Sequence, residues 1–228
     1  MENSCLNLDL GTTSYENAMD VQSKLHDLVR CKKLTNIVLT LMHPHIITIG
    51  KTGSNQDIKI SQEAISDANI RIVRTNRGGK VTYHGPGQLI VYPIINLREL
   101  NLGPQKYIFK IEETIIRTLN EFGVKGDRSV GNHGVWVDDA KIAAIGVKIS
   151  QGISSHGFSI NLNPNLSYFD FIVPCGIPDK SVCSLHSLGI TTIDSNYFRD
   201  ILLKNFSSVF DLSIKTCFPD EIKHMSII

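Results

Sequence analysis

Three runs rich in β-branched residues follow one another between residues 71 and 97, and glycine-rich corners separate them. The runs read RIVRT (71–75), KVTYH (80–84) and QLIVYPIINL (88–97), and the corners read NRGG and HGPG. Runs of this kind predict strands, and the glycine clusters between them predict tight turns. This part of the chain therefore predicts a sheet with glycine-rich loops at its rim.

Helical periodicity marks other parts of the chain. The clearest helix is expected from Gly103-Pro104 to Phe122, because apolar residues recur there at spacings of three and four and a glycine follows. The pattern Thr13-x-x-Glu16 predicts a capping box and a helix after it. A last helix is expected over about 194–210 and a weaker one over 61–68.

The remaining β-rich segments complete the predicted sheet. NIVLTLMH and HIITIG (36–43 and 45–50) suggest paired strands broken by Pro44, and GVWVDDAKIAAIGVKIS (134–150) reads as a hairpin around Asp138-Asp139. ISSHGFSINL (153–162) extends the sheet. Helices around many strands predict an α/β (α+β) fold, with residues 1–228 forming a single domain in which a mixed β-sheet is flanked by helices.

Composition excludes several classes of function. With 228 residues and a net charge of +1, the chain shows no general surface for nucleic acid or an anionic membrane. No apolar run approaches a membrane span, and the N-terminal residues have no apolar signal core, so we expect a soluble protein. The five cysteines form no C-x-x-C pair, which indicates a reducing compartment.

Three short motifs resemble known sites and fail. Gly50-Lys51-Thr52 ends like a phosphate-binding loop, but the required earlier glycine is His45. Gly85-Pro86-Gly87 begins like a dinucleotide fingerprint and runs into a strand. His43-x-His45 lacks the accompanying ligands of a metal site, so no metal is implied.

The stretch VPCGIPDK (173–180) places Cys175 in a turn, where an inert loop cysteine and a nucleophile are both open interpretations. Lys141 begins a strand and, taken alone, fits a solvated hairpin lysine. His156 is two positions from Phe158 on one strand, so both are expected on one face, toward a pocket or the core. The glycine pairs around Thr82, Tyr83 and His84 favour a loop that approaches a ligand.

Four motifs in order, RGGKVTYHGPGQ, GVWV with KIAAIG, HGFSIN and PCGI, resemble the lipoyl(octanoyl) transferase family. The resemblance extends from about Leu10 to Leu185 and implies the fold of biotin and lipoate protein ligases. It implies an acyltransferase that moves octanoyl from acyl carrier protein to a lysine of lipoyl domains, those of 2-oxoacid dehydrogenases and the glycine cleavage H protein. It implies no cofactor, a monomer, and a cytoplasmic location, or the mitochondrial matrix in a eukaryote.

The resemblance also implies a site. Its nucleophile falls on Cys175 and its lysine on Lys141. The substrate pocket falls on Arg77, Gly78, Gly79, Lys80, Val81, Thr82, Tyr83, His84, Ala144, Ile145, Gly146, Gly157, Phe158 and Ser159. Family members often have alanine where Ser159 stands.

The chemistry of these residue types agrees with the implied roles. A nearby lysine ammonium favours the thiolate form of a cysteine, which is the nucleophile. Backbone N–H groups near Gly176 and in the 77–85 loop are candidates for an oxyanion hole. Arg77 and Lys148 are expected at the mouth, where they would steer acidic partners.

Two other functions fit the same residues. One is an ATP-dependent lipoate ligase on the same fold, in which Cys175 would be incidental. The other is a non-catalytic module that binds acyl carrier protein or lipoyl domains. A cysteine protease is disfavoured, because no protease signature surrounds Cys175.

Overall fold

A mixed sheet runs through the computed structural model, which describes residues 4–61, 63, 65, 68–173 and 181–217. Eight strands of this described part form the sheet. Their order across it is β11 (Ser213–Cys217), β1 (Ser4–Thr12), β2 (Asn36–Met42), β6 (Gln88–Ile94), β10 (Ile153–Asn161), β9 (Ala140–Ser150), β8 (Asn132–Val137) and β7 (Asp127–Ser129). β1 lies parallel to β11 and β2, and the other neighbours are antiparallel.

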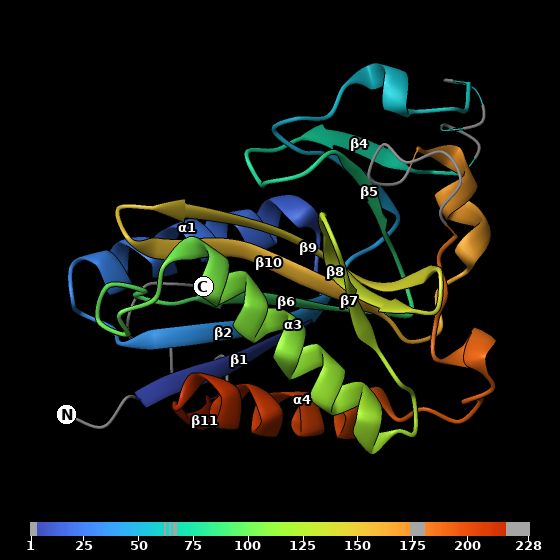
Figure 1. Cartoon of the computed structure of the whole chain (residues 1–228). Coiled ribbons are helices and arrows are strands. Elements are labelled where there is room, and N and C mark those ends of the chain that lie inside the picture. Colours follow the sequence, from blue (N-terminus) through green and yellow to red (C-terminus); the bar gives the residue numbers. More distant parts are fainter. Residues whose placement is uncertain (1–3, 62, 64, 66–67, 174–180, 218–228) are drawn as a thin grey trace.

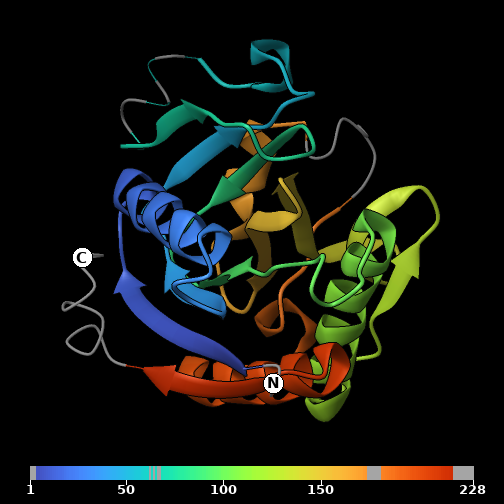
Figure 2. The ribbon, with the colours of Figure 1, turned by 90° about the vertical axis from the view of Figure 1, so that its left-hand side faces the viewer.

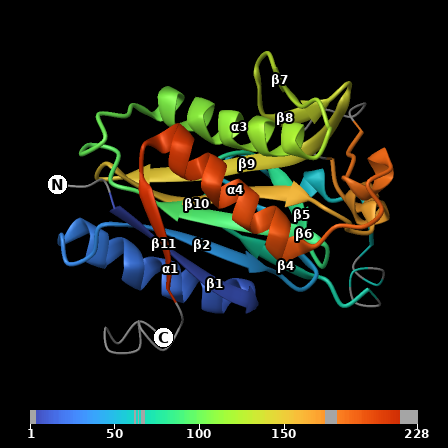
Figure 3. The same cartoon turned by 90° about the horizontal axis from the view of Figure 1, so that it is seen from below.

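Helices cover both faces of the large sheet. Helices α3 (Pro104–Glu121) and α4 (Ser195–Phe210) lie against one face, and α1 (Tyr15–Arg30) lies against the other (Figures 1 and 3). Strands β6 and β10 at its centre are buried along their whole length. A strand covered on both faces has no solvent side, which explains why LIVYPI in β6 shows no polar alternation.

A second, three-stranded sheet packs beside the first, in the order β4 (Arg71–Arg74), β3 (Ile46–Ile49), β5 (Val81–His84) (Figure 2). The expected pairing of 36–43 with 45–50 is therefore wrong. After β2 the chain turns at Pro44 and enters the small sheet, where β3 lies parallel to β4 and antiparallel to β5. The side chain of His43 fixes the segment in which the chain passes from the large sheet to the small one. Its Nδ1 lies 2.8 Å from the Thr13 carbonyl and its Nε2 lies 2.9 Å from the Tyr92 hydroxyl.

The predicted mixed sheet with flanking helices is confirmed, and most local predictions agree with the structure. The α3 helix begins after Gly103 with Pro104 in its first turn, as expected. The hairpin of β8 and β9 turns at Asp138, whose φ is 51°. The capping box at Thr13 is wrong by one residue, because Ser14 is the cap and its side chain accepts from Asn17 N–H. Several residues of the weak helix at 61–68 lie outside the described residues.

Short 3-10 turns connect the strands at the edges of the fold. They span Asn55–Asp57, Leu166–Phe171 and His186–Leu188. Among the residues described, no helix combines the length and the apolar character needed to cross a bilayer.

Candidate active site

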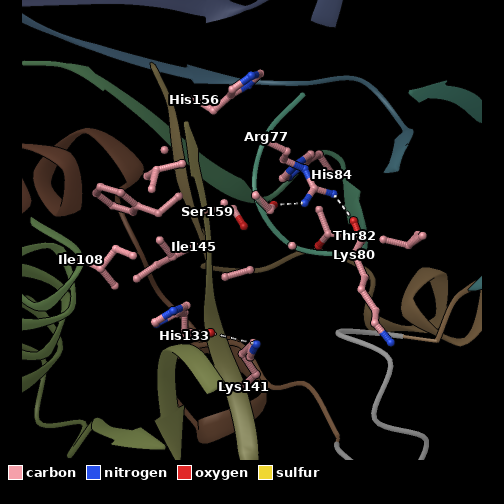
Figure 4. Close-up of a pocket in the computed structure, with 18 of the residues that line it drawn as sticks. Arg77, Lys80, Thr82, His84, Ile108, His133, Lys141, Ile145, His156 and Ser159 are labelled. Atoms are coloured by element: carbon pink, nitrogen blue, oxygen red, sulfur yellow. Dashed lines mark hydrogen bonds between the residues drawn. The ribbon is translucent and has the colours of Figure 1, made fainter. Parts of the chain in front are cut away.

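A cavity of about 330 Å³ lies where the small sheet meets strands β9 and β10 of the large sheet (Figure 4). Two walls form it. The first, which we call the loop wall, is residues 77–84, and the second, the sheet wall, comprises residues 141–147 of β9 and 156–159 of β10. Of the pocket residues expected from the sequence, the cavity is lined by Arg77, Gly78, Gly79, Lys80, Val81, Thr82, His84, Ala144, Ile145, Gly146, Gly157, Phe158 and Ser159, together with Lys141.

The register of β9 and β10 explains why these distant segments meet. Phe158 is opposite Ile145 and Ser159 is opposite Ala144 in the antiparallel pair. Glycine is required at position 157, because a Cβ there would lie 2.0 Å from the Val91 carbonyl oxygen of β6. Apart from Lys141, His156 and Ser159, the sheet wall thus consists of small and apolar residues.

Lys141 is the cation of the sheet wall. It is buried, with 7% of its surface exposed, and its Nζ donates to the His133 carbonyl at 3.1 Å. The ammonium also lies 4.6 Å from the centre of the Trp136 ring, a favourable cation–π arrangement. The interpretation of Lys141 as a solvated hairpin lysine is therefore wrong, and its charge is held at the edge of the cavity.

Arg77 has a different role from the one expected. Its guanidinium donates to the Thr48 carbonyl at 2.6 Å and hydroxyl at 2.9 Å, and to the carbonyls of Gly78 and Lys80. These bonds hold the loop wall on β3. With 8% of its surface exposed, Arg77 is not a mouth residue that steers partners. Unlike Arg77, Lys148 does not line this cavity, and it lies in a neighbouring groove.

His84 and His156 are buried, neutral groups. Burial, with His43 and Arg77 nearby, lowers the pKa of His84 to about 3. Burial, then Arg77 and Lys148, lowers the pKa of His156 to about 4. His156 has φ of 54° in the middle of β10, and its Nε2 lies 2.7 Å from Asn76 Oδ1. Both imidazoles are therefore uncharged at neutral pH.

Tyr83 is the one expected pocket residue of the loop wall that does not line the cavity. Its side chain lies on the other face of β5, where the ring stacks on Tyr168 at 5.0 Å and the hydroxyl meets His45 Nδ1 at 2.8 Å. Alternation along a strand places Thr82 and His84 together and Tyr83 opposite.

The cavity has further lining residues that the sequence motifs do not contain. They are Tyr15, Thr52, Tyr92, Ile108, Gly131, Asn132, His133 and Val147. His156 of the HGFSIN motif was expected toward a pocket or the core, and it lines the cavity. Three of these residues belong to helices or a strand whose apolar pattern is typical of a protein core: Tyr15, Tyr92 and Ile108. Nothing in the neighbouring sequence shows that they face the cavity.

Among the loop amides proposed as oxyanion donors, the Gly78 N–H is already bonded to the Val147 carbonyl at 3.0 Å. This bond joins the loop wall to the sheet wall. Gly146 lies at the same junction, where an added Cβ would be 3.1 Å from Arg77 Cδ and from the Gly78 carbonyl oxygen. The walls therefore touch directly through backbone.

The expected nucleophile Cys175 lies outside the described residues, which stop at Val173 and resume at Ser181. Both flanking residues are fixed. The Val173 N–H donates to the Asp57 carbonyl at 2.7 Å, and the Ser181 carbonyl accepts from the backbone N–H of Lys141 at 2.9 Å. Within the described part of the chain, no group of three or more His, Cys, Asp or Glu side chains could hold a metal.

The sheet, its flanking helices and the cavity define the fold of the lipoate protein ligases. A crystal structure of lipoate-protein ligase A bound with ATP superposes with a TM-score of 0.79, at 13% identity, covering 100% of this chain and 92% of that one. At this identity the likeness concerns the fold alone.

Sequence comparison gives the family. Residues 14–207 match the lipoyl protein ligase A/B catalytic domain, and the chain belongs to this family. The octanoyltransferase of Alkaliphilus metalliredigens is 38% identical over 91% of this chain and 95% of its own length. That of Solibacter usitatus is 39% identical over 94% and 96%. The expectations of this family and of an acyltransferase are confirmed.

Proposed function

We propose that this protein, as one acyltransferase domain over residues 1–228, moves an octanoyl group from acyl carrier protein through a Cys175 thioester to a lysine of a lipoyl domain. The observation that carries the proposal is the buried Lys141 ammonium beside a cavity that apolar side chains line in part. Full-length likeness to octanoyltransferases supports the same assignment.

The position of Lys141 supports a thiolate at Cys175. The backbone of Lys141 holds Ser181, six residues after Cys175, at a hydrogen-bonded bridge. A unit positive charge 4 Å from a thiolate contributes about 4 kcal/mol at an effective dielectric of 20, part of which solvent screens. This is enough to raise the thiolate fraction at neutral pH.

The reaction then has two balanced steps. The Cys175 thiolate attacks the carbonyl carbon of the carrier thioester, a new carbon–sulfur bond forms, and the carrier leaves as a thiolate that takes a proton to become the thiol. The neutral amine of the target lysine next attacks the octanoyl-Cys175 carbonyl, an amide forms, and Cys175 leaves with the proton that the amine loses. The thioester supplies the driving force, so no ATP is consumed.

The apolar part of the cavity suits the acyl chain. Val81, Ile108, Ile145 and Phe158 line it. Burying a chain of this length at about 0.8 kcal/mol per methylene contributes on the order of 5 kcal/mol. The chain therefore supplies binding free energy that a shorter acyl group lacks.

The test is incubation with octanoyl carrier protein and a lipoyl domain, with and without ATP, followed by mass spectrometry of the peptides. We expect ATP-independent transfer and an octanoyl group on the peptide that holds Cys175. Cys183→Ser is the matched control, because burial raises the pKa of that thiol to about 11 and leaves it unreactive. Transfer without any acyl-Cys175, or acylation of Cys183 alone, contradicts the mechanism.

The alternatives give different results in the same experiment. A lipoate ligase would require ATP and free lipoate or octanoate, and a binding module would transfer nothing. The proposed partners, octanoyl carrier protein and the lipoyl domains of 2-oxoacid dehydrogenases or the glycine cleavage H protein, place the enzyme in the cytoplasm, or in the mitochondrial matrix of a eukaryote.

A further inference from the structure

A chain of three hydrogen bonds connects His84 to the backbone beyond the cavity. The Nδ2 of Asn161 donates to the Cys183 carbonyl at 2.9 Å, and Asn161 Oδ1 accepts from Gln88 Nε2 at 2.9 Å. Gln88 Nε2 also reaches the Tyr83 carbonyl at 3.3 Å. Its Oε1 lies 3.2 Å from His84 Nδ1. All three side chains are buried.

The two amide groups have only one workable orientation. Turning Asn161 over would set its oxygen against the Cys183 carbonyl oxygen, and turning Gln88 over would set its oxygen against the Tyr83 carbonyl oxygen. A carbonyl oxygen cannot donate, so either change would leave two acceptors facing each other. The oxygen of Gln88 therefore faces His84, and the proton of that hydrogen bond is on His84 Nδ1.

A neutral imidazole with a proton on Nδ1 has a bare lone pair on Nε2. Burial lowers the pKa of His84 and keeps the ring neutral, and two neighbours act in the same direction, since His43 lies 6.1 Å away between ring centres and Arg77 is the nearby cation. His43 is itself committed to the Thr13 carbonyl and the Tyr92 hydroxyl. Among the described residues, Nε2 of His84 has no hydrogen-bond partner, and His84 lines the cavity.

We propose that Gln88 and Asn161 hold His84 in the Nδ1–H tautomer, so that its Nε2 accepts a hydrogen bond from the attacking amine of the target lysine. This inference rests on the proposed function. His84 is then the group that touches the substrate, and Gln88 and Asn161 are positioning residues.

The chemistry of the two steps selects the amine as the donor. At its reacting end the carrier thioester has only a carbonyl oxygen and a sulfur, and neither offers a proton to an acceptor. The lysine amine has two hydrogens and one lone pair. A bond from one N–H to a fixed acceptor turns that lone pair toward the carbonyl carbon. His84 therefore serves transfer and leaves loading unaffected.

The first test is nitrogen NMR of histidine-labelled enzyme without substrate, which reads the tautomer directly. We expect the wild-type spectrum to show His84 with protonated Nδ1 and unprotonated Nε2 between pH 6 and 8. Gln88→Met removes the acceptor, and it should move His84 toward the Nε2–H tautomer. A wild-type spectrum with protonated Nε2 overturns the proposal.

The second test measures loading and transfer separately by quenched single-turnover mass spectrometry. Gln88→Met should slow transfer roughly tenfold, the loss expected for one hydrogen bond to a reacting group, and leave loading within about twofold of wild type.

The matched control is Thr40→Val, which removes another buried hydrogen bond of the large sheet, from Thr40 Oγ1 to Asn7 Oδ1. It should change neither the tautomer nor the ratio of transfer to loading. If Gln88→Met switches the tautomer and transfer is unchanged, the inference is wrong and the proposed function stands. Failure of loading in the wild type would instead contradict the proposed function.

Discussion

The two walls of the cavity each contain one buried cation, and the two cations differ in the groups that they contact. Arg77 in the loop wall and Lys141 in the sheet wall are 8% and 7% exposed. The guanidinium is bonded to three backbone carbonyls and the Thr48 hydroxyl, all from its own wall and the adjoining β3. The Lys141 ammonium has one carbonyl and one aromatic face among its described contacts. Equal burial thus accompanies several backbone hydrogen bonds in one wall and, in the other, the chemical role that we propose for Lys141.

The difference follows from the shapes of the two side chains. A guanidinium has five N–H donors in a rigid plane, which can join several carbonyls of a glycine-rich loop at once. An ammonium is a compact charge that can also release a proton. Exchanging the two residue types should therefore damage the protein in different ways.

The largest effect is expected at Lys141. Lys141→Ala should lower transfer by a factor of roughly 100 to 10,000, because the proposed mechanism loses both the cation that favours the Cys175 thiolate and a proton-transfer group. Loss of a nearby cation raises the pKa of a thiol, so the alkylation profile of Cys175 should move to higher pH. Lys141→Arg should move that profile less and still lose most transfer. Coinciding alkylation profiles of wild type and Lys141→Ala would show that the two side chains are not coupled.

An effect of intermediate size is expected at Arg77, where substitution should lower the stability of the fold. Arg77→Lys should lower the free energy of unfolding by about 2–4 kcal/mol, because the Thr48 and Lys80 carbonyls lose their donors inside the protein. Chemical denaturation of this variant beside Lys141→Arg measures the contrast. We expect the Lys141 variant to keep nearly wild-type stability. Equal losses in both would mean that the walls do not differ in the way proposed.

The smallest effect is expected at Gly146, where the walls touch. The Cβ of Gly146→Ala would press on Arg77 Cδ and the Gly78 carbonyl at 3.1 Å, which should cost about 1 kcal/mol of stability and slow acyl loading. Thermal unfolding and the rate of acyl-enzyme formation measure the two effects. Gly103→Ala is the control, since no atom lies within 4 Å of its added Cβ. Identical behaviour of the two variants would rule out a tight junction.

Local patterns predicted most of the helices and the central strands. The apolar spacing that ends at Gly123 marks α3, and the Asp138 turn marks the hairpin of β8 and β9, because both depend on neighbours in sequence. The edge strands β7 and β11, and strand β1 beside β11, were not predicted. Strand β11 joins the sheet only by pairing in parallel with β1, where Ser4 lies opposite Ser213. The two strands are more than 200 residues apart in the sequence, so local patterns do not reveal the pairing.

The family motifs predicted more of the site residues than local sequence patterns could. They placed Arg77, Ala144 and Phe158 in one pocket, and the structure brings these residues to one cavity. They could not separate Tyr83 from its neighbours, since the face on which a strand residue lies depends on which sheet covers which side. The binding roles of the lining residues remain predictions.

The sequence by itself determined the order of elements, the four motifs and the residue types that meet in the site. Those depend on periodicity, turn chemistry and side-chain identity, all of which are local. Only the tertiary structure decided the surroundings of each cation. Arg77 holds the loop wall because Thr48, 29 positions away, supplies acceptors to its guanidinium, and Lys141 lies buried at the edge of the cavity, where we propose its chemical role. Burial and hydrogen-bond partners come from residues distant in sequence, and these determine whether a charge holds the fold or serves a reaction.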